Sequence, residues 1–123
     1  DAKALLAEEG LDVRVVSMPC LNRFDEQPQA YRDQVLPPQI ENRVALEMGA
    51  SAPWYKYVGL RGQVIGVDRF GLSGDGHELA TAFGFTPSHV AATFKQLAGV
   101  RQLGAASVLP AYQERPARAA SFL

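Results

Sequence analysis

The chain has 123 residues, with 12 Lys and Arg against 13 Asp and Glu, and 47% of its residues are hydrophobic. This composition is typical of a single globular domain that can build an apolar core. A formal net charge of -1, without a block of like charges, argues against nucleic-acid binding, because phosphate recognition needs a clustered basic face.

The sequence also argues against a membrane protein and favours a cytoplasmic one. No segment approaches the roughly 20 apolar residues that cross a bilayer, and no signal peptide is recognised. Cys20 is the single cysteine, so no disulfide can form within the chain. The first residue is not Met and a helix begins at once, so we expect a piece of a larger polypeptide.

The N-terminal segment predicts a helix followed by a strand. Residues 2–9 read as helix, with Leu5 and Leu6 on its inner face, and Gly10 follows its end. Residues 12–18 are rich in valine and predict a strand covered on both faces. Helix, glycine and strand make half of a βαβ unit whose first strand would precede Asp1.

The next elements predicted are a helix and a second strand. Residues 21–24 are expected to form a loop, and Asp25 is expected to cap a helix that carries Tyr31 and Val35 on its inner face. Residues 43–48, closed by Gly49, predict a strand, although their composition also suits a helix.

A short aromatic segment then leads to a third strand. Residues 51–58 predict a helix of about two turns capped by Ser51. Its aromatic residues either pack against the sheet or form a surface for a partner. The run Val64–Val67 is β-branched and predicts a buried strand.

Two helices are predicted after the glycine-rich loop that follows this strand. Asp75 is placed to cap the first helix, and Thr86 with Pro87 marks the start of the second. Beyond residue 99 the hydrophobic pattern fades. We therefore expect a domain over residues 1–99 and an irregular tail over residues 100–123.

The carboxyl ends of the predicted strands are where a site is sought first, because ligands of open α/β sheets gather there. The stretch Gly66–Gly71 ends one strand with an acid, a base, an aromatic and a glycine. An anion or ligand site formed by Glu47, Arg69 and Ser73 is one hypothesis; a tight turn with structural ion pairs or caps is the other. A buried Glu47 would need a partner such as Arg69 or Lys56.

No catalytic, cofactor-binding or metal-binding residue is predicted from the sequence. The histidines, His77 and His89, have no further ligand at metal-binding spacing. Cys20 has no base beside it in the sequence that would activate it as a nucleophile.

Several motifs together resemble the C-terminal domain of transketolase. They are Val13–Pro19, Phe24-Asp25-x-Gln27-Pro28-x-x-Tyr31-Arg32-x-x-Val35-Leu36-Pro37, Trp54-x-Lys56-Tyr57-Val58-Gly59, Gly66–Gly71 with Ser73, and Phe83–Thr86. They occur in the family's order over residues 1–99.

The resemblance implies a three-layer α/β/α domain with a mostly parallel sheet, here without the family's first strands. It implies a parent enzyme that transfers a two-carbon ketol unit from a ketose phosphate to an aldose phosphate. Thiamine diphosphate and a divalent metal (Mg or Ca) would lie between other domains, at the interface of a homodimer. This domain would be structural or would support the dimer, and its partner would be the rest of the polypeptide.

Two alternatives stay open at the level of the sequence. The chain is either a free-standing regulatory module that binds an anion or sugar phosphate, or the equivalent domain of another thiamine-diphosphate enzyme. Deoxyxylulose-phosphate synthase and ketoacid dehydrogenase are examples of the latter.

Overall fold

The structure, a computed structural model, describes residues 1–99, so the predicted tail at 100–123 lies outside the described residues. Along the chain the elements are α1 (Ala2–Glu8), α2 (Leu21–Asp25), α3 (Gln29–Val35), β1 (Val44–Leu46), the 3-10 turn η1 (Ala52–Trp54), α4 (Tyr55–Val58), β2 (Gln63–Ile65), α5 (Gly76–Ala82) and α6 (Pro87–Leu97).

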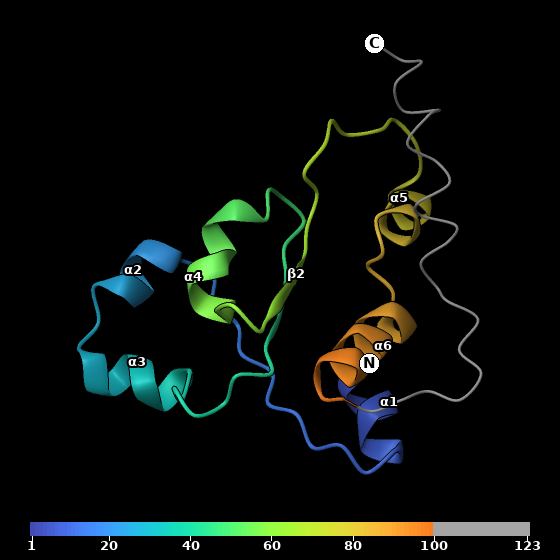
Figure 1. Cartoon of the computed structure of the whole chain (residues 1–123). Coiled ribbons are helices and arrows are strands. Elements are labelled where there is room, and N and C mark those ends of the chain that lie inside the picture. The colour runs from blue at the N-terminus through green and yellow to red at the C-terminus, as the bar shows by residue number, and fades with distance from the viewer. Residues whose placement is uncertain (100–123) are drawn as a thin grey trace.

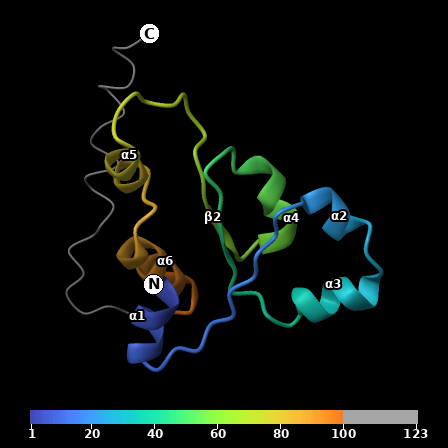
Figure 2. The same ribbon diagram turned by 180° about the vertical axis from the view of Figure 1, so that it is seen from behind.

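The elements form three layers, as the α/β/α prediction requires. In Figure 1, α2, α3 and α4 lie on one side of the strands, and α1, α5 and α6 lie on the other. The view from behind shows the same separation (Figure 2). The predicted α/β class is confirmed.

The central layer is a parallel pair of strands, β1 and β2. Ala45 lies opposite Val64, and the ladder continues past both ends, from Gln63 N to Arg43 O (2.9 Å) and from Val67 N to Gly49 O (2.8 Å). Parallel strands require a crossover connection, and η1 with α4 supplies it.

The helix ends confirm several signals read from the sequence. The Asp75 carboxylate accepts hydrogen bonds from His77 N and Glu78 N at the start of α5. Thr86 Oγ1 accepts from His89 N at the start of α6, whose first residue is proline. Gly84 separates these helices with φ of +86°, a conformation that costs little only for glycine.

The core is small and lies between the strands and the helices on each side. Its buried apolar residues are Leu6, Ala45, Tyr57, Val58, Ile65 and Ala91. Leu5, predicted on the inner face with Leu6, is 37% exposed. The prediction for Leu5 was wrong, because neighbouring helical positions point about 100° apart and Leu6 takes the inward one.

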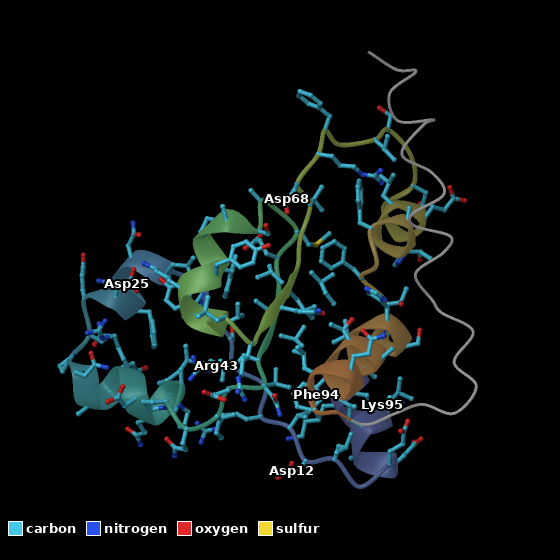
Figure 3. The ribbon with its side chains drawn as sticks, in the orientation of Figure 1. Asp12, Asp25, Arg43, Asp68, Phe94 and Lys95 are labelled. Carbon is cyan, nitrogen blue, oxygen red and sulfur yellow. The ribbon has the colours of Figure 1, made fainter. Side chains whose placement is uncertain are left out.

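An ion pair between a buried lysine and a half-exposed glutamate joins the two helices that pack together in one outer layer, α1 and α6. Lys95 is only 4% exposed, and its Nζ lies 2.7 and 2.9 Å from the two carboxylate oxygens of Glu9. A lysine buried to this extent needs such a partner, since an unpaired buried charge is strongly unfavourable. Lys95 lies in the C-terminal half of α6 (Figure 3).

Arg43 connects the helices of the other layer to the sheet. Its guanidinium donates to the carbonyls of Tyr57 (2.6 Å), Pro37 (2.8 Å) and Leu36 (3.3 Å), and its Nε donates to Ile40 O (2.8 Å). Two of these carbonyls belong to the C-terminal ends of α3 and α4, where a positive charge is stabilising.

The predicted strand over residues 12–18 is wrong for the described structure. The segment is extended but makes no backbone–backbone hydrogen bond to another described residue, and Val15 is 73% exposed. A strand is stabilised by its ladder, and none of the described strands pairs with this segment. Its attachment comes from Arg14, which donates to Gln34 O and Val35 O at the end of α3.

The predicted loop at residues 21–24 and the predicted cap at Asp25 are also wrong. Residues 21–25 form α2, so Asp25 ends a helix instead of starting one, and Pro28 precedes α3 without a side-chain cap. Asp25 makes its hydrogen bonds to Lys56 and Tyr57 of α4 instead. The carboxylate that local spacing predicted to cap a helix therefore makes a tertiary contact.

We predict that Gly62→Ala destabilises the fold. A Cβ at this position would clash with Val58 O and would lie 2.8 Å from Arg43 O, at the point where α4 turns into β2. Overpacking against backbone costs about 1–3 kcal/mol of unfolding free energy. Urea unfolding followed by the fluorescence of the single tryptophan, Trp54, measures the loss; Gly71→Ala, with nothing within 4 Å, is the control and should change little.

We predict a second loss of stability for Arg43→Met. Methionine keeps the stem of the side chain but removes every hydrogen bond to the carbonyls, so the unfolding free energy should fall by about 2 kcal/mol or more. Arg61→Met removes only an exposed pair with Glu41 (3.0 Å) and should cost at most about 1 kcal/mol. Equal effects of the two variants in the same urea titration would contradict the role given to Arg43.

Candidate functional site

The edge where β1 and β2 end carries the residues that the sequence singled out. Both strands run toward the same end because they are parallel, which places Glu47 just after β1 and residues 66–71 just after β2. Asp68 marks this end of the sheet in Figure 3. The contacts of each side chain decide what this edge can do.

The Glu47 carboxylate is held by two hydrogen bonds from residues that follow it closely in the chain. Its Oε2 accepts from Trp54 Nε1 (2.8 Å) and its Oε1 accepts from Gly49 N (2.8 Å). The turn after β1 brings the indole and an amide to this half-buried carboxylate, whereas the sequence suggested Arg69 or Lys56 as examples of a partner for a buried Glu47. Glu47 orders this turn and orients Trp54.

Asp68 connects the end of β2 to the start of η1. Its Oδ1 accepts from Ser51 N (2.8 Å) and its Oδ2 accepts from Ser51 Oγ (2.6 Å). These bonds, the one from the hydroxyl first and the one from the amide second, lower the pKa of Asp68 because they stabilise the carboxylate. Ser51 was predicted to cap the helix that follows, but its hydroxyl serves Asp68 instead.

The side chains of Arg69 and Ser73 have different neighbours from those of Glu47. The guanidinium carbon of Arg69 is 4.9 Å from the centre of the Phe83 ring, a cation–π contact between the loop and the end of α5. Ser73 is exposed in the loop between β2 and α5. An anion site formed by Glu47, Arg69 and Ser73 stays a prediction.

A cluster that sequence analysis missed lies at the ends of α2 and α4. Asp25 accepts from Lys56 Nζ and from Tyr57 OH (2.8 Å), and Tyr57 contacts the ring of Phe24 at 5.8 Å. The hydrogen bond from Lys56 is the main cause that lowers the pKa of Asp25, and the one from Tyr57 adds to it. About 30 residues separate Asp25 from Lys56 and Tyr57, so no local sequence pattern predicts the contact.

The aromatic residues of this segment differ in burial, and only some of them pack against the rest of the domain. Tyr57 is buried, and burial, followed by its hydrogen bond to Asp25, raises the pKa of its hydroxyl. Trp54 is half-buried and lies edge-on to Tyr57, with ring centres 5.9 Å apart. Tyr55 is 55% exposed and does not join the core.

Within residues 1–99 no three side chains of His, Cys, Asp or Glu gather in a way that would hold a metal ion. In the same part of the chain no helix is both long and apolar enough to cross a bilayer. The carboxylates at the edge of the sheet are engaged in holding turns together. The fold and this site define a small α/β domain in which Glu47 and Asp68 hold turns of the domain itself.

Comparison with known proteins identifies the domain more closely. Residues 1–86 match the family described as "Transketolase-like TK C-terminal domain". The chain belongs to this family.

Its relatives are transketolases of much greater length. The transketolase of Geobacillus stearothermophilus is 47% identical over 98 residues, which are 80% of this chain and 15% of that protein. The transketolase of Bacillus subtilis is 45% identical over 97 residues, which are 79% of this chain and 14% of that protein. A crystal structure of a mutant transketolase from Pichia stipitis aligns with a TM-score of 0.69 at 31% identity, covering 84% of this chain and 16% of that one.

The two carboxylates with lowered pKa values predict a loss of stability in acid. A carboxylate whose pKa is lower in the folded than in the unfolded state stabilises the fold fully above the unfolded value, about 4, and this contribution is lost as the pH falls through the folded pKa. Unfolding free energy should therefore decrease steeply below a pH of about 4.

Asp68→Asn should make this acid dependence shallower, since one of the shifted groups is gone. Urea unfolding at neutral and acid pH measures this dependence of the unfolding free energy on pH. Asp12→Asn is the control, because the Asp12 side chain is fully exposed and its only ion pair is a contact of 3.9 Å with Lys3 among the described residues. An Asp68→Asn variant with the acid dependence of the parent chain would show that the bonds to Ser51 do not stabilise the fold.

Proposed function

We propose that the chain is the C-terminal portion of a transketolase and that the parent protein transfers a two-carbon ketol unit between sugar phosphates. The observation that carries the proposal is the match to the C-terminal domain family over residues 1–86, together with identities of 45–47% to two transketolases. A structural relative from Pichia stipitis is described as a complex with xylulose-5-phosphate, which supports sugar phosphates as the substrate class.

The role of this portion in the parent is structural. The chain spans about 15% of the length of the curated relatives it matches. Glu47 and Asp68, the carboxylates at the edge of the sheet, are bonded to Trp54, Gly49 and Ser51. Groups engaged in this way stabilise turns and do not act as an acid–base pair on a substrate.

The parent would use thiamine diphosphate and a divalent metal, which supply a nucleophilic carbanion and an anchor for the diphosphate. Among residues 1–99 no three His, Cys, Asp or Glu side chains gather in a way that would hold the metal ion. We assign the metal and the thiamine diphosphate to other domains of the parent, and no step of the reaction to a residue of this chain. Homodimerisation of the parent and a cytoplasmic location belong to the same proposal.

The experiment is an assay of ketol transfer from xylulose 5-phosphate to ribose 5-phosphate in the presence of thiamine diphosphate and magnesium. The full-length gene product should show turnover, and residues 1–123 alone should show none. Turnover by residues 1–123 alone would contradict the structural role, and an inactive full-length protein would contradict the proposed activity. The absorbance of NADH in a coupled assay of the triose phosphate product gives the rate.

A further inference from the structure

Asp75 is the one aspartate of this chain that is followed by glycine, in the segment Gly74-Asp75-Gly76. Such a pair can react with itself, because the amide nitrogen of the second residue can attack the side-chain carboxyl carbon of the first. Glycine favours the attack, since it has no Cβ to obstruct the approach and its backbone is the most permissive. Both residues are exposed, and a Cβ on Gly76 would meet nothing within 4 Å. The surroundings therefore leave room for the two groups to react.

The reacting groups lie at the start of α5. The Asp75 carboxylate accepts hydrogen bonds from His77 N (2.9 Å) and Glu78 N (3.3 Å). The amide of Gly76 is the first of the helix and has no acceptor within it. Because the cap holds the carboxylate on the next two amides, the Gly76 nitrogen can attack only when the cap opens. The rate of a slow reaction of this kind follows the fraction of molecules in which the cap is open.

The helix α5 is built so that its cap opens easily. It has seven residues, none of which is buried. A helix of this length is not stable by itself, and segments with few buried contacts open at the smallest cost in free energy. By contrast, α6 has eleven residues and buries Ala91, Thr93 and Lys95. We therefore expect the cap at Asp75 to open more often than the cap at Thr86.

We propose that Asp75 is a modification site, at which the protein forms isoaspartate without an enzyme and at a rate that the opening of α5 controls. A bond forms between Gly76 N and Asp75 Cγ, and the bond from Cγ to one carboxyl oxygen breaks. That oxygen leaves as water with the amide proton and the carboxyl proton, and a cyclic imide remains. Water then opens the imide, either at Cγ to restore aspartate or at the main-chain carbonyl carbon to give isoaspartate.

Isoaspartate changes the start of α5 permanently. The main chain then runs through Cγ of residue 75 and is one methylene longer. Cγ no longer carries a carboxylate, so the cap on His77 N and Glu78 N is lost. The former main-chain carboxyl group of residue 75 becomes a free side group. A methyltransferase that uses S-adenosylmethionine and recognises isoaspartate can esterify this group, which makes the modification measurable.

The experiment ages the full-length protein at neutral pH for several weeks and then digests it with trypsin. Cleavage after Arg69 and Lys95 gives the peptide 70–95, in which Asp75 is the single aspartate. Methyl groups transferred to each peptide by protein isoaspartate methyltransferase count the isoaspartate. Peptide 70–95 should gain it several times faster than peptide 4–14, whose Asp12 is fully exposed but followed by valine. Equal rates in the two peptides, or no isoaspartate in peptide 70–95, would overturn the proposal.

The variant Gly76→Ala tests the attack by the amide nitrogen of residue 76. Its Cβ hinders the approach to the carboxyl carbon, so isoaspartate at residue 75 should form several times more slowly. The open space around Gly76 accepts the methyl group without a clash, and alanine is the better helix former. An unchanged rate would contradict the proposed bond between residues 76 and 75.

A matched pair of variants at Thr81 tests the control by α5. Thr81 is exposed and its Oγ1 donates to His77 O (2.9 Å), a bond that Thr81→Gly and Thr81→Ala both remove. Glycine is the poorer helix former, so isoaspartate should form about fivefold faster in the glycine variant than in the alanine variant. Equal rates would refute control by the opening of α5. These peptide measurements do not use ketol transfer, so their outcome is independent of the proposed function.

Discussion

The arrangement of the layer formed by α2, α3 and α4 depends on one guanidinium group. Arg43 stands immediately before β1 and binds carbonyls at the ends of two helices and in the loop between α3 and the strand. Arginine suits this position because its planar fork offers several donors in fixed directions and stays charged. The position of α4 then determines where Trp54, Lys56 and Tyr57 lie, and through them the contacts of Glu47 and Asp25.

Structural features that depend only on residues close together in the sequence were predictable. Asp75 and Thr86 are cap residues followed by helix-forming segments, and both caps exist, because a cap needs only the amides two or three residues further along. The strands at 44–46 and 63–65 follow from short β-branched or apolar runs, and their parallel pairing follows from the helix between them. The family motifs carried the three-layer arrangement and the identity of the domain.

The partners of the polar residues were not predictable from the sequence. Glu47 has an indole and an amide as donors, and Asp25 has a lysine and a tyrosine from a helix about 30 residues away. Such contacts depend on how helices are placed in space, and periodicity does not report that. Residues 12–18 have the composition of a strand, but a strand also needs a neighbour, and none of the described strands provides one.

The ion pair between Glu9 and Lys95 has a consequence for how the domain folds. The two residues are 86 positions apart, almost the full length of the described chain. Contacts of such sequence separation are slow to form, because a long loop must close before they contribute. On the ribosome, α1 must wait until α6 has been synthesised, so the layer containing the first helix of this chain is completed at the end of translation of the described part.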